Sequence, residues 1–375
     1  MDVRDFDFLL PSELIAQEPS AEPTAARLLQ LDRATGATAH RTVAALPSLL
    51  RRGDLLVVND TRVFPARLIG HRVPTGGAVE CLLVAPAEAV RRSGRDSDSS
   101  AADDEHEIRH LAASETEQHW EALMHPGQKL KPGARLLFEG SPAIHGEVVA
   151  RRFFGRRIVR LWTADATPLE AAVDAIGHVP LPPYIKRSDR ASDRDRYQTV
   201  FAARRGSVAA PTAGLHFTPD LLEALGQSGV DCAAITLHVG YGTFQPVRVE
   251  RVEDHRVEPE CYEVGPRAAD QINAALKERR RVIAVGTTTT RTLEAAARAG
   301  GGSIAAGRGR TDLFIYPGFE FRVVQGLLTN FHLPQSSLLM LVAAFAGRAR
   351  VLAAYREAIA ARYRFYSYGD AMLVL

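Results

Sequence analysis

Short apolar runs that end in small and polar residues recur along the second half of the chain, and they constrain its fold more than any other feature. The runs occupy residues 208–217, 233–240, 282–288, 313–318 and 327–334. Each is too short for a free-standing helix, and several precede a helical pattern, as buried parallel strands do. The sequence therefore predicts an α/β domain in which these runs are parallel strands with polar tips.

The polar tips mark the expected site, because ligands of parallel α/β folds bind outside the carboxyl ends of the strands. Chemistry is expected above all at residues 208–217, where Thr212 and Gly214 precede a histidine. We expect one crevice to bring together His216, His238, Thr287, Tyr316, Asn330 and His332.

The length of 375 residues exceeds what one hydrophobic core usually organises, so we expect two domains. Between residues 65 and 162 the pattern changes to short strands separated by turn residues, which favours a small antiparallel barrel or sandwich. Within it, residues 91–118 are rich in Ser, Asp, Glu and Ala, and we predict a disordered surface loop. The prediction is an α/β main domain at 1–64 and 163–375 with an inserted β domain at 65–162.

The three cysteines have neither CxxC spacing nor an even number, which argues against a disulfide framework and a cysteine-based zinc site. The amino terminus has no apolar signal region, and no apolar run approaches membrane-spanning length. We therefore expect a cytoplasmic protein with no membrane anchor.

Histidines near the predicted strand ends raise the question of a metal site. None of them has HxH, HExxH or similar chelating spacing, so a metal site would need ligands from distant segments. We expect no metal. As general bases or hydrogen-bond donors the histidines are more plausible, since imidazole titrates near neutral pH.

Arginines cluster at Arg151, Arg152, Arg156 and Arg157 although the formal net charge is only +2. Arginine pairs with phosphate and the interleaved phenylalanines add stacking surface, so this cluster is a candidate RNA-facing hairpin. A solvated hairpin in an arginine-biased sequence explains the cluster equally well.

Residues 286–291, Gly-Thr-Thr-Thr-Thr-Arg, lie where a predicted strand passes into a helix. Backbone N–H groups, the hydroxyls of Thr287 and Thr288, and the guanidinium of Arg291 suit a carboxylate or a phosphate there. The alternative is a helix capped by threonine. The segment matches neither GxGxxG nor GxxxxGK[ST], so it specifies neither a dinucleotide nor a nucleoside triphosphate.

Several strings together resemble the S-adenosylmethionine:tRNA ribosyltransferase-isomerase family of queuosine biosynthesis. They span nearly the whole chain in order, at residues 5–8, 14–17, 53–63, 180–185, 196–200, 210–217, 237–240, 242–244, 285–288, 329–334 and 368–372. The most specific is Ala-Pro-Thr-Ala-Gly-Leu-His-Phe at 210–217. One departure is His255-Arg256-Val257-Glu258, where relatives usually show a second histidine, which further weakens a metal site.

The resemblance implies a β-barrel module inserted into an α/β domain related to half of a (β/α) barrel. It implies transfer of the ribosyl part of S-adenosylmethionine to 7-aminomethyl-7-deazaguanine at the wobble position of tRNA, giving epoxyqueuosine-tRNA with release of adenine and methionine. S-adenosylmethionine is then a co-substrate, no true cofactor is required, and we expect a monomer.

This reaction assigns roles to the site residues. His216 and His238 are the candidate general bases, Thr287, Thr288 and Arg291 the anion clamp, and Asn330 and His332 the partners of the base or of adenine. Two other functions stay open at this point, a metal-dependent hydrolase on a barrel-like scaffold and a non-catalytic tRNA-binding module.

Overall fold

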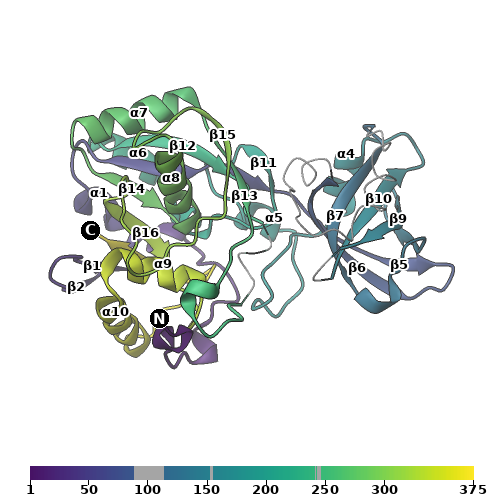
Figure 1. Ribbon diagram of the computed structural model, residues 1–375, viewed down its shortest axis with the longest axis horizontal. Helices are drawn as coiled ribbons and strands as arrows, with labels where there is room; N and C mark the ends of the chain where they lie inside the picture. Colours follow the sequence, from purple (N-terminus) through teal and green to yellow (C-terminus); the bar gives the residue numbers. More distant parts are fainter. Residues whose placement is uncertain (88–113, 153–154, 241, 243–245) are drawn as a thin grey trace. The chain divides into compact units, whose positions relative to one another are not determined.

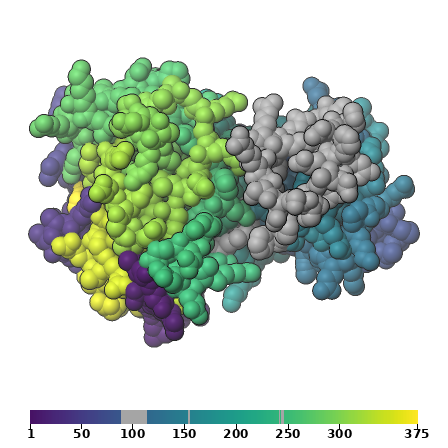
Figure 2. All heavy atoms as spheres, viewed as in Figure 1, coloured from purple at the N-terminus to yellow at the C-terminus, as the bar shows by residue number. Residues whose placement is uncertain are grey.

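The computed structural model describes residues 1–87, 114–152, 155–240, 242 and 246–375. The chain forms two compact units: Met1–Arg62 together with Pro182–Leu375, and Val63–Leu181. We refer to them as the sheet unit and the barrel unit (Figure 1). The C-terminal part of the chain, coloured yellow-green to yellow, makes up much of the visible face of the sheet unit (Figure 2).

The sheet unit is built on a nine-stranded mixed sheet with the order β15-β13-β12-β3-β14-β16-β17-β1-β2. Its middle is parallel and consists of β12 (Asp231–Leu237), β3 (Leu55–Asn59), β14 (Val282–Val285) and β16 (Gly326–Asn330). Every residue of β3, β14 and β16 is buried, as expected of parallel strands covered on both faces.

Antiparallel pairs extend the sheet on both sides of this parallel centre. The strands outside the centre are β1 (Arg27–Leu31), β2 (Thr38–Thr42), β13 (Glu260–Val264), β15 (Gly307–Thr311) and β17 (Ala371–Val374). A separate two-stranded sheet joins β4 (Thr61–Val63) and β11 (Arg204–Ser207).

Helices pack against both faces of the sheet, and the pleat directs alternate side chains to the two cores. In β3, Val57 faces the larger core, whereas Leu56 and Val58 face the smaller one. The larger core includes side chains of α7 (Pro266–Lys277), α8 (Thr287–Ala299), α9 (Ser337–Ala346) and α10 (Arg348–Ala360), and the smaller includes those of α1 (Leu46–Leu49) and α6 (Pro219–Gln227). A short helix, α5 (Asp193–Arg196), lies in the segment before β11.

Helix α6 begins as its sequence predicts. Thr218 is the N-cap and its side chain accepts a hydrogen bond from the Leu221 N–H at 3.2 Å, while Pro219 occupies the first turn. Among the described residues, no single helix is long and apolar enough to cross a bilayer, although α9 and α10 together, bent by 114°, pass that test of length and composition.

Two of the five predicted strands are wrong. Residues 208–217 follow β11 and enter a 3-10 helix at Thr212–His216, and residues 313–318 follow β15 without joining a sheet. Both stretches contain a proline, Pro211 or Pro317, which has no N–H to donate to a neighbouring strand.

The barrel unit is a closed antiparallel barrel with the order β10-β7-β6-β5-β8-β9. Its strands are β5 (Arg67–Val73), β6 (Ala78–Pro86), β7 (Glu117–His125), β8 (Arg135–Phe138), β9 (Ile144–Arg151) and β10 (Arg156–Thr163). The predicted fold class, an α/β main domain with a small antiparallel β-barrel, is confirmed.

Two boundaries in this region differ from the prediction. The compact unit continues past residue 162 to Leu181, because α4 (Leu169–Ile176) contacts β9 and β10. Of the predicted loop at 91–118, residues 91–113 lie outside the described residues. Glu117 and Gln118 do not belong to a loop, since they begin β7 and pair with β10.

Candidate active site

A pocket of about 540 Å³, its open mouth included, lies at the carboxyl ends of β14 and β16. Five residues that the sequence predicted for the site line it: Thr212, Thr287, Thr288, Asn330 and His332. The strands end here, and the polar side chains that follow them face one space, as the parallel arrangement requires.

Five other predicted residues do not line this pocket: Gly214, His216, His238, Arg291 and Tyr316. Gly214 is needed for packing, because a Cβ there would lie 2.7 Å from both Phe201 and Thr199. Tyr316 packs beside Phe314 at the edge of the larger core. The expectation that all of the strand-end residues share one crevice is thereby corrected.

Asn330 lines the pocket and is the centre of a hydrogen-bond network. Its Oδ1 accepts from the Thr212 hydroxyl at 3.1 Å, and its Nδ2 donates to the Tyr366 carbonyl at 3.1 Å. The same Nδ2 lies 3.3 Å from Nε2 of His216. Because the other contacts fix the amide orientation, Nε2 of His216 is the acceptor in this contact. His216 therefore does not line the pocket and contacts a residue that does, Asn330.

Burial lowers the pKa of His216 to about 4 and the pKa of His332 to about 3. Both imidazoles are therefore neutral at pH 7, which is the form that accepts a proton. Nε2 of His332 lies 2.9 Å from the Thr329 hydroxyl, and its backbone N–H donates to the Tyr355 hydroxyl at 3.0 Å. His332 is thus held rigidly at the pocket wall.

The amino terminus of α8 opens on the pocket through Gly286, Thr287 and Thr288. Gly286 is the N-cap and has φ of 92°, a conformation that favours glycine, and no side chain caps the helix. The first N–H groups of a helix have no intrahelical acceptor. Thr288 is 7% exposed, and its buried hydroxyl has no hydrogen-bond partner in the described part of the chain. These donors together suit a bound anion.

Arg291 lies one turn further along α8 and does not reach this anion site. Its guanidinium is buried in an ion pair with Glu260 of β13, and Glu260 also accepts the Gly240 N–H at 3.0 Å. Burial lowers the pKa of Arg291 to about 10. The predicted clamp thus consists of the two threonines and the helix terminus, and Arg291 is a core residue.

His238 directly follows β12, is half-buried and does not line the pocket. Its Nδ1 lies 2.9 Å from the Thr61 hydroxyl, and the same ring covers Gly206, where a Cβ would lie 2.7 Å from the imidazole. Burial lowers the pKa of His238, and the nearby Asp60 opposes this shift. His216 and His238 are therefore in separate environments.

Sequence reasoning gave no role to three residues that line the pocket, Tyr184, Tyr366 and Ser367. The Tyr184 hydroxyl is hydrogen-bonded to Ser367, and its ring contacts Tyr366 edge-on with centroids 3.8 Å apart. Burial raises the pKa of Tyr184 well above its usual value. Tyr184 belongs to the Pro-Leu-Pro-Pro-Tyr-Ile string at 180–185, which contributes to the family resemblance but predicted no site residue.

In the barrel unit, the four clustered arginines are not equivalent. Arg156 forms an ion pair with Glu121 at 2.9 Å, and Arg157 is buried, donating to the carbonyls of Leu130 and Gly127. Arg151 is exposed and Arg152 is partly so. The two phenylalanines between them lie outside the described residues.

Groups of three or more His, Cys, Asp or Glu side chains placed to hold a metal ion do not occur in the described part of the chain. The three cysteines are free thiols.

Comparison with known proteins places this site in a family of tRNA-modifying enzymes. The family model described as queuosine biosynthesis protein matches residues 3–374. The S-adenosylmethionine:tRNA ribosyltransferase-isomerases of Heliobacterium modesticaldum and Solibacter usitatus are 48% and 50% identical to the chain, with full coverage of both sequences in each case. The crystal structure of the S-adenosylmethionine tRNA ribosyltransferase from Thermotoga maritima is similar with a TM-score of 0.52 and 35% identity, covering 99% of this chain and 100% of that one.

The chain therefore belongs to the queuosine biosynthesis protein family. It is an enzyme of the transferase and isomerase class, and its activity is ribosyl transfer with isomerisation between S-adenosylmethionine and tRNA.

Proposed function

We propose that this enzyme transfers the ribosyl part of S-adenosylmethionine to 7-aminomethyl-7-deazaguanine at the tRNA wobble position and isomerises it to give epoxyqueuosine-tRNA. The observation that carries the site assignment is the uncapped amino terminus of α8, which opens on the pocket together with the unpartnered Thr288 hydroxyl. These groups bind the methionine carboxylate, because helix termini favour anions and the hydroxyl gains a partner.

The chemistry begins at the sulfonium of S-adenosylmethionine, which acidifies the hydrogens on the adjacent 5′ carbon. A base removes one of them and adenine departs. The amine of the tRNA base attacks the ribose-derived fragment, and closure of the epoxide expels methionine. The enzyme must supply a base, a donor to the departing adenine and a fixed position for the methionine end. S-adenosylmethionine is consumed as a substrate, and the scheme requires no metal and no further cofactor.

We assign the base to His216, because a neutral imidazole is the form that accepts a proton. Asn330, which donates to its Nε2, holds the ring beside the pocket wall and is not a proton relay, so the substrate must reach the ring itself. His332 is the proposed donor to adenine, and Asn330, whose two amide hydrogens go to Tyr366 and His216, is proposed to hold the base. His238, which contacts Thr61 and not the pocket, is the second candidate base.

The RNA partner is proposed to contact the barrel unit through Arg151 and Arg152, which remain available on the surface while Arg156 and Arg157 are committed to the barrel. Because the substrate is tRNA, we place the enzyme in the cytoplasm. We propose that it acts as a monomer.

The test is mass spectrometry of a precursor tRNA carrying 7-aminomethyl-7-deazaguanine after incubation with the enzyme and S-adenosylmethionine. The expected result is epoxyqueuosine-tRNA with equimolar adenine and methionine. A tRNA mass that does not change, or one that increases by a methyl group, overturns the proposal.

A further inference from the structure

A tight loop at residues 364–370 carries part of the pocket wall. Tyr366 and Ser367 at its tip line the pocket, and the Tyr366 carbonyl accepts the hydrogen bond from Asn330. Tyr366 has φ of 74°, which is unusual for any residue except glycine. A backbone of this kind persists only where the surrounding contacts determine it.

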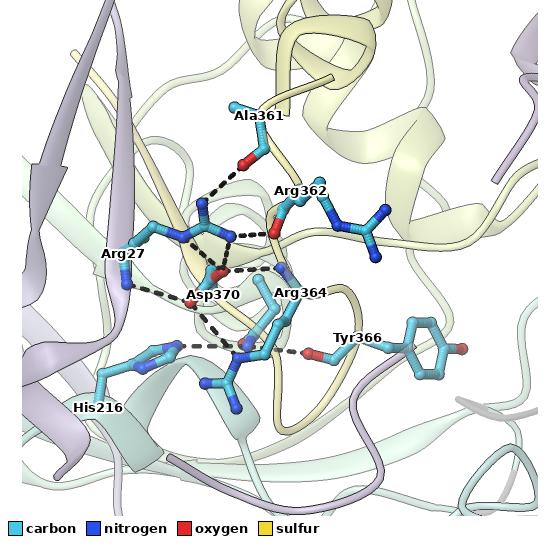
Figure 3. Close-up of polar contacts among 8 residues, drawn as sticks. Arg27, His216, Ala361, Arg362, Arg364, Tyr366 and Asp370 are labelled. Atoms are coloured by element: carbon cyan, nitrogen blue, oxygen red, sulfur yellow. Dashed lines mark hydrogen bonds and ion pairs between the residues drawn. The ribbon is translucent and has the colours of Figure 1, made fainter. Parts of the chain in front are cut away.

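The contacts that determine this loop converge on Asp370, which is 2% exposed (Figure 3). Its carboxylate accepts the Arg364 N–H at 2.7 Å, and its own N–H donates to the Arg364 carbonyl at 2.8 Å. The two residues therefore close the base of the loop. Gly369 lies inside it, where a Cβ would approach the Arg364 carbonyl to 2.5 Å, so the closed loop leaves no room for a side chain at this position.

Arg27 of β1 attaches this loop to the rest of the sheet unit. Its N–H and its guanidinium both bond to Asp370, with Nη2 at 3.2 Å from Oδ2. The same guanidinium donates to the carbonyls of Ala361 and Arg362 just after α10. One carboxylate thus links β1, the end of α10 and the pocket loop.

We infer that Asp370 is a positioning residue for the ribosyl transfer, which it controls by holding Tyr366 against Asn330 and thereby Asn330 against His216. This inference rests on the proposed function of the pocket. Asp370 itself is not among the residues that line the pocket. Burial lowers the pKa of His216 and the Asp370 carboxylate opposes this shift, so Asp370 reaches the proposed base through its charge as well as through the loop geometry.

Asp54 provides a matched control, because it is another buried aspartate that pairs with an arginine and accepts a backbone N–H. It bonds Arg281 at 2.8 and 2.5 Å and accepts the Arg51 N–H at 2.7 Å. Asp54 directly precedes β3, so it lies at the amino end of the parallel strands and the pocket lies at their carboxyl ends.

The experiment compares Asp370→Asn with Asp54→Asn by thermal unfolding, by steady-state kinetics and by hydrogen exchange at residues 364–370. We expect similar losses of Tm. Asp370→Asn alone should lower kcat, by up to about 100-fold, with a smaller rise in the KM for S-adenosylmethionine, and alone should speed exchange in the loop. If Asp370→Asn does not fold, Arg27→Lys with Arg281→Lys as its control tests the same link.

Equal kcat for the two variants, or equal loop exchange, overturns the positioning role and leaves Asp370 a purely structural residue. If the parent enzyme shows no ribosyl transfer, the proposed function is overturned. If Asp370→Asn still speeds exchange in the loop of that enzyme, the structural link between Asp370 and the loop remains intact.

Discussion

The buried ion pair between Arg291 and Glu260 gives the sharpest quantitative prediction. The sequence assigns Arg291 to an anion clamp for a carboxylate or a phosphate. The structure places it 7% exposed against Glu260, itself 6% exposed. Replacing Glu260 by Gln leaves the guanidinium charge buried without a counter-charge, so the change should act on folding.

The magnitude follows from the cost of an uncompensated buried charge. Breaking such a pair from one side costs about 3–5 kcal/mol, whereas replacing both partners by apolar residues is often close to neutral. At about 2–4 °C per kcal/mol for a domain of this size, Glu260→Gln should lower the Tm by roughly 10 °C. The double variant Glu260→Leu with Arg291→Met should recover most of the stability that Glu260→Gln loses. It should remain about 1 kcal/mol less stable than the parent, because the Gly240 N–H loses its acceptor.

The assay is reversible urea unfolding at pH 7 of the parent, both single variants and the double variant, with the KM for S-adenosylmethionine measured on folded protein. A loss below about 1 kcal/mol in Glu260→Gln would show that the pair is not the buried unit described here. A double variant as unstable as the single one would refute the charge argument. An Arg291→Met variant of normal stability and raised KM would return the residue to the substrate site.

Three further outcomes are expected. Thr288→Val should raise the KM for S-adenosylmethionine at least about tenfold, since a hydrogen bond to a charged group contributes about 1.5–3 kcal/mol; an unchanged KM in initial-rate assays would move the carboxylate elsewhere. Burial lowers the pKa of His216 from 6.5 to about 4 and that of His332 from 6.5 to about 3. As the pH falls, these two histidines therefore take up protons in the unfolded chain before they do so in the folded protein. Stability should fall below about pH 6.5, by about 2 kcal/mol per histidine between pH 7 and 5, and urea unfolding of His332→Gln should show a shallower fall. Changing Arg151 and Arg152 to Ser should reduce the slope of log Kd for tRNA against log salt by about 1 to 2 in filter binding, and an unaltered slope would exclude them from the interface.

The fold was largely predictable because its strongest signals are periodic and local. The apolar runs that became β14 and β16 are buried on both faces, which removes the polar alternation and makes them recognisable. Residues 208–217 and 313–318 carry the same composition but contain prolines at Pro211 and Pro317. Whether such a run pairs with a neighbouring strand depends on its backbone N–H donors, and a description by composition does not show which positions lack one.

The site was predictable only in part, because strand-end position fixes the edge of the sheet and not the direction of each side chain. Thr288 and Asn330 reach the pocket, whereas Arg291, one turn beyond Thr287, points to Glu260 of a neighbouring strand. Glu260 is 31 residues away in sequence, and no local pattern connects the two. Tyr366 was missed for a similar reason, since its placement depends on the loop closed by Asp370.

The central strand of the sheet has a consequence for synthesis of the protein on the ribosome. β3 precedes the whole barrel unit in the sequence, yet its hydrogen-bonding neighbours β12 and β14 follow that unit. At about 5–20 residues per second, the apolar strand Leu55–Asn59 waits on the order of ten seconds or more before either neighbour has been translated. The barrel is continuous in sequence and is able to fold during that delay. Nascent chains of this enzyme therefore expose an unpaired hydrophobic strand, which makes them candidates for chaperone binding and for aggregation when translation stalls after the barrel.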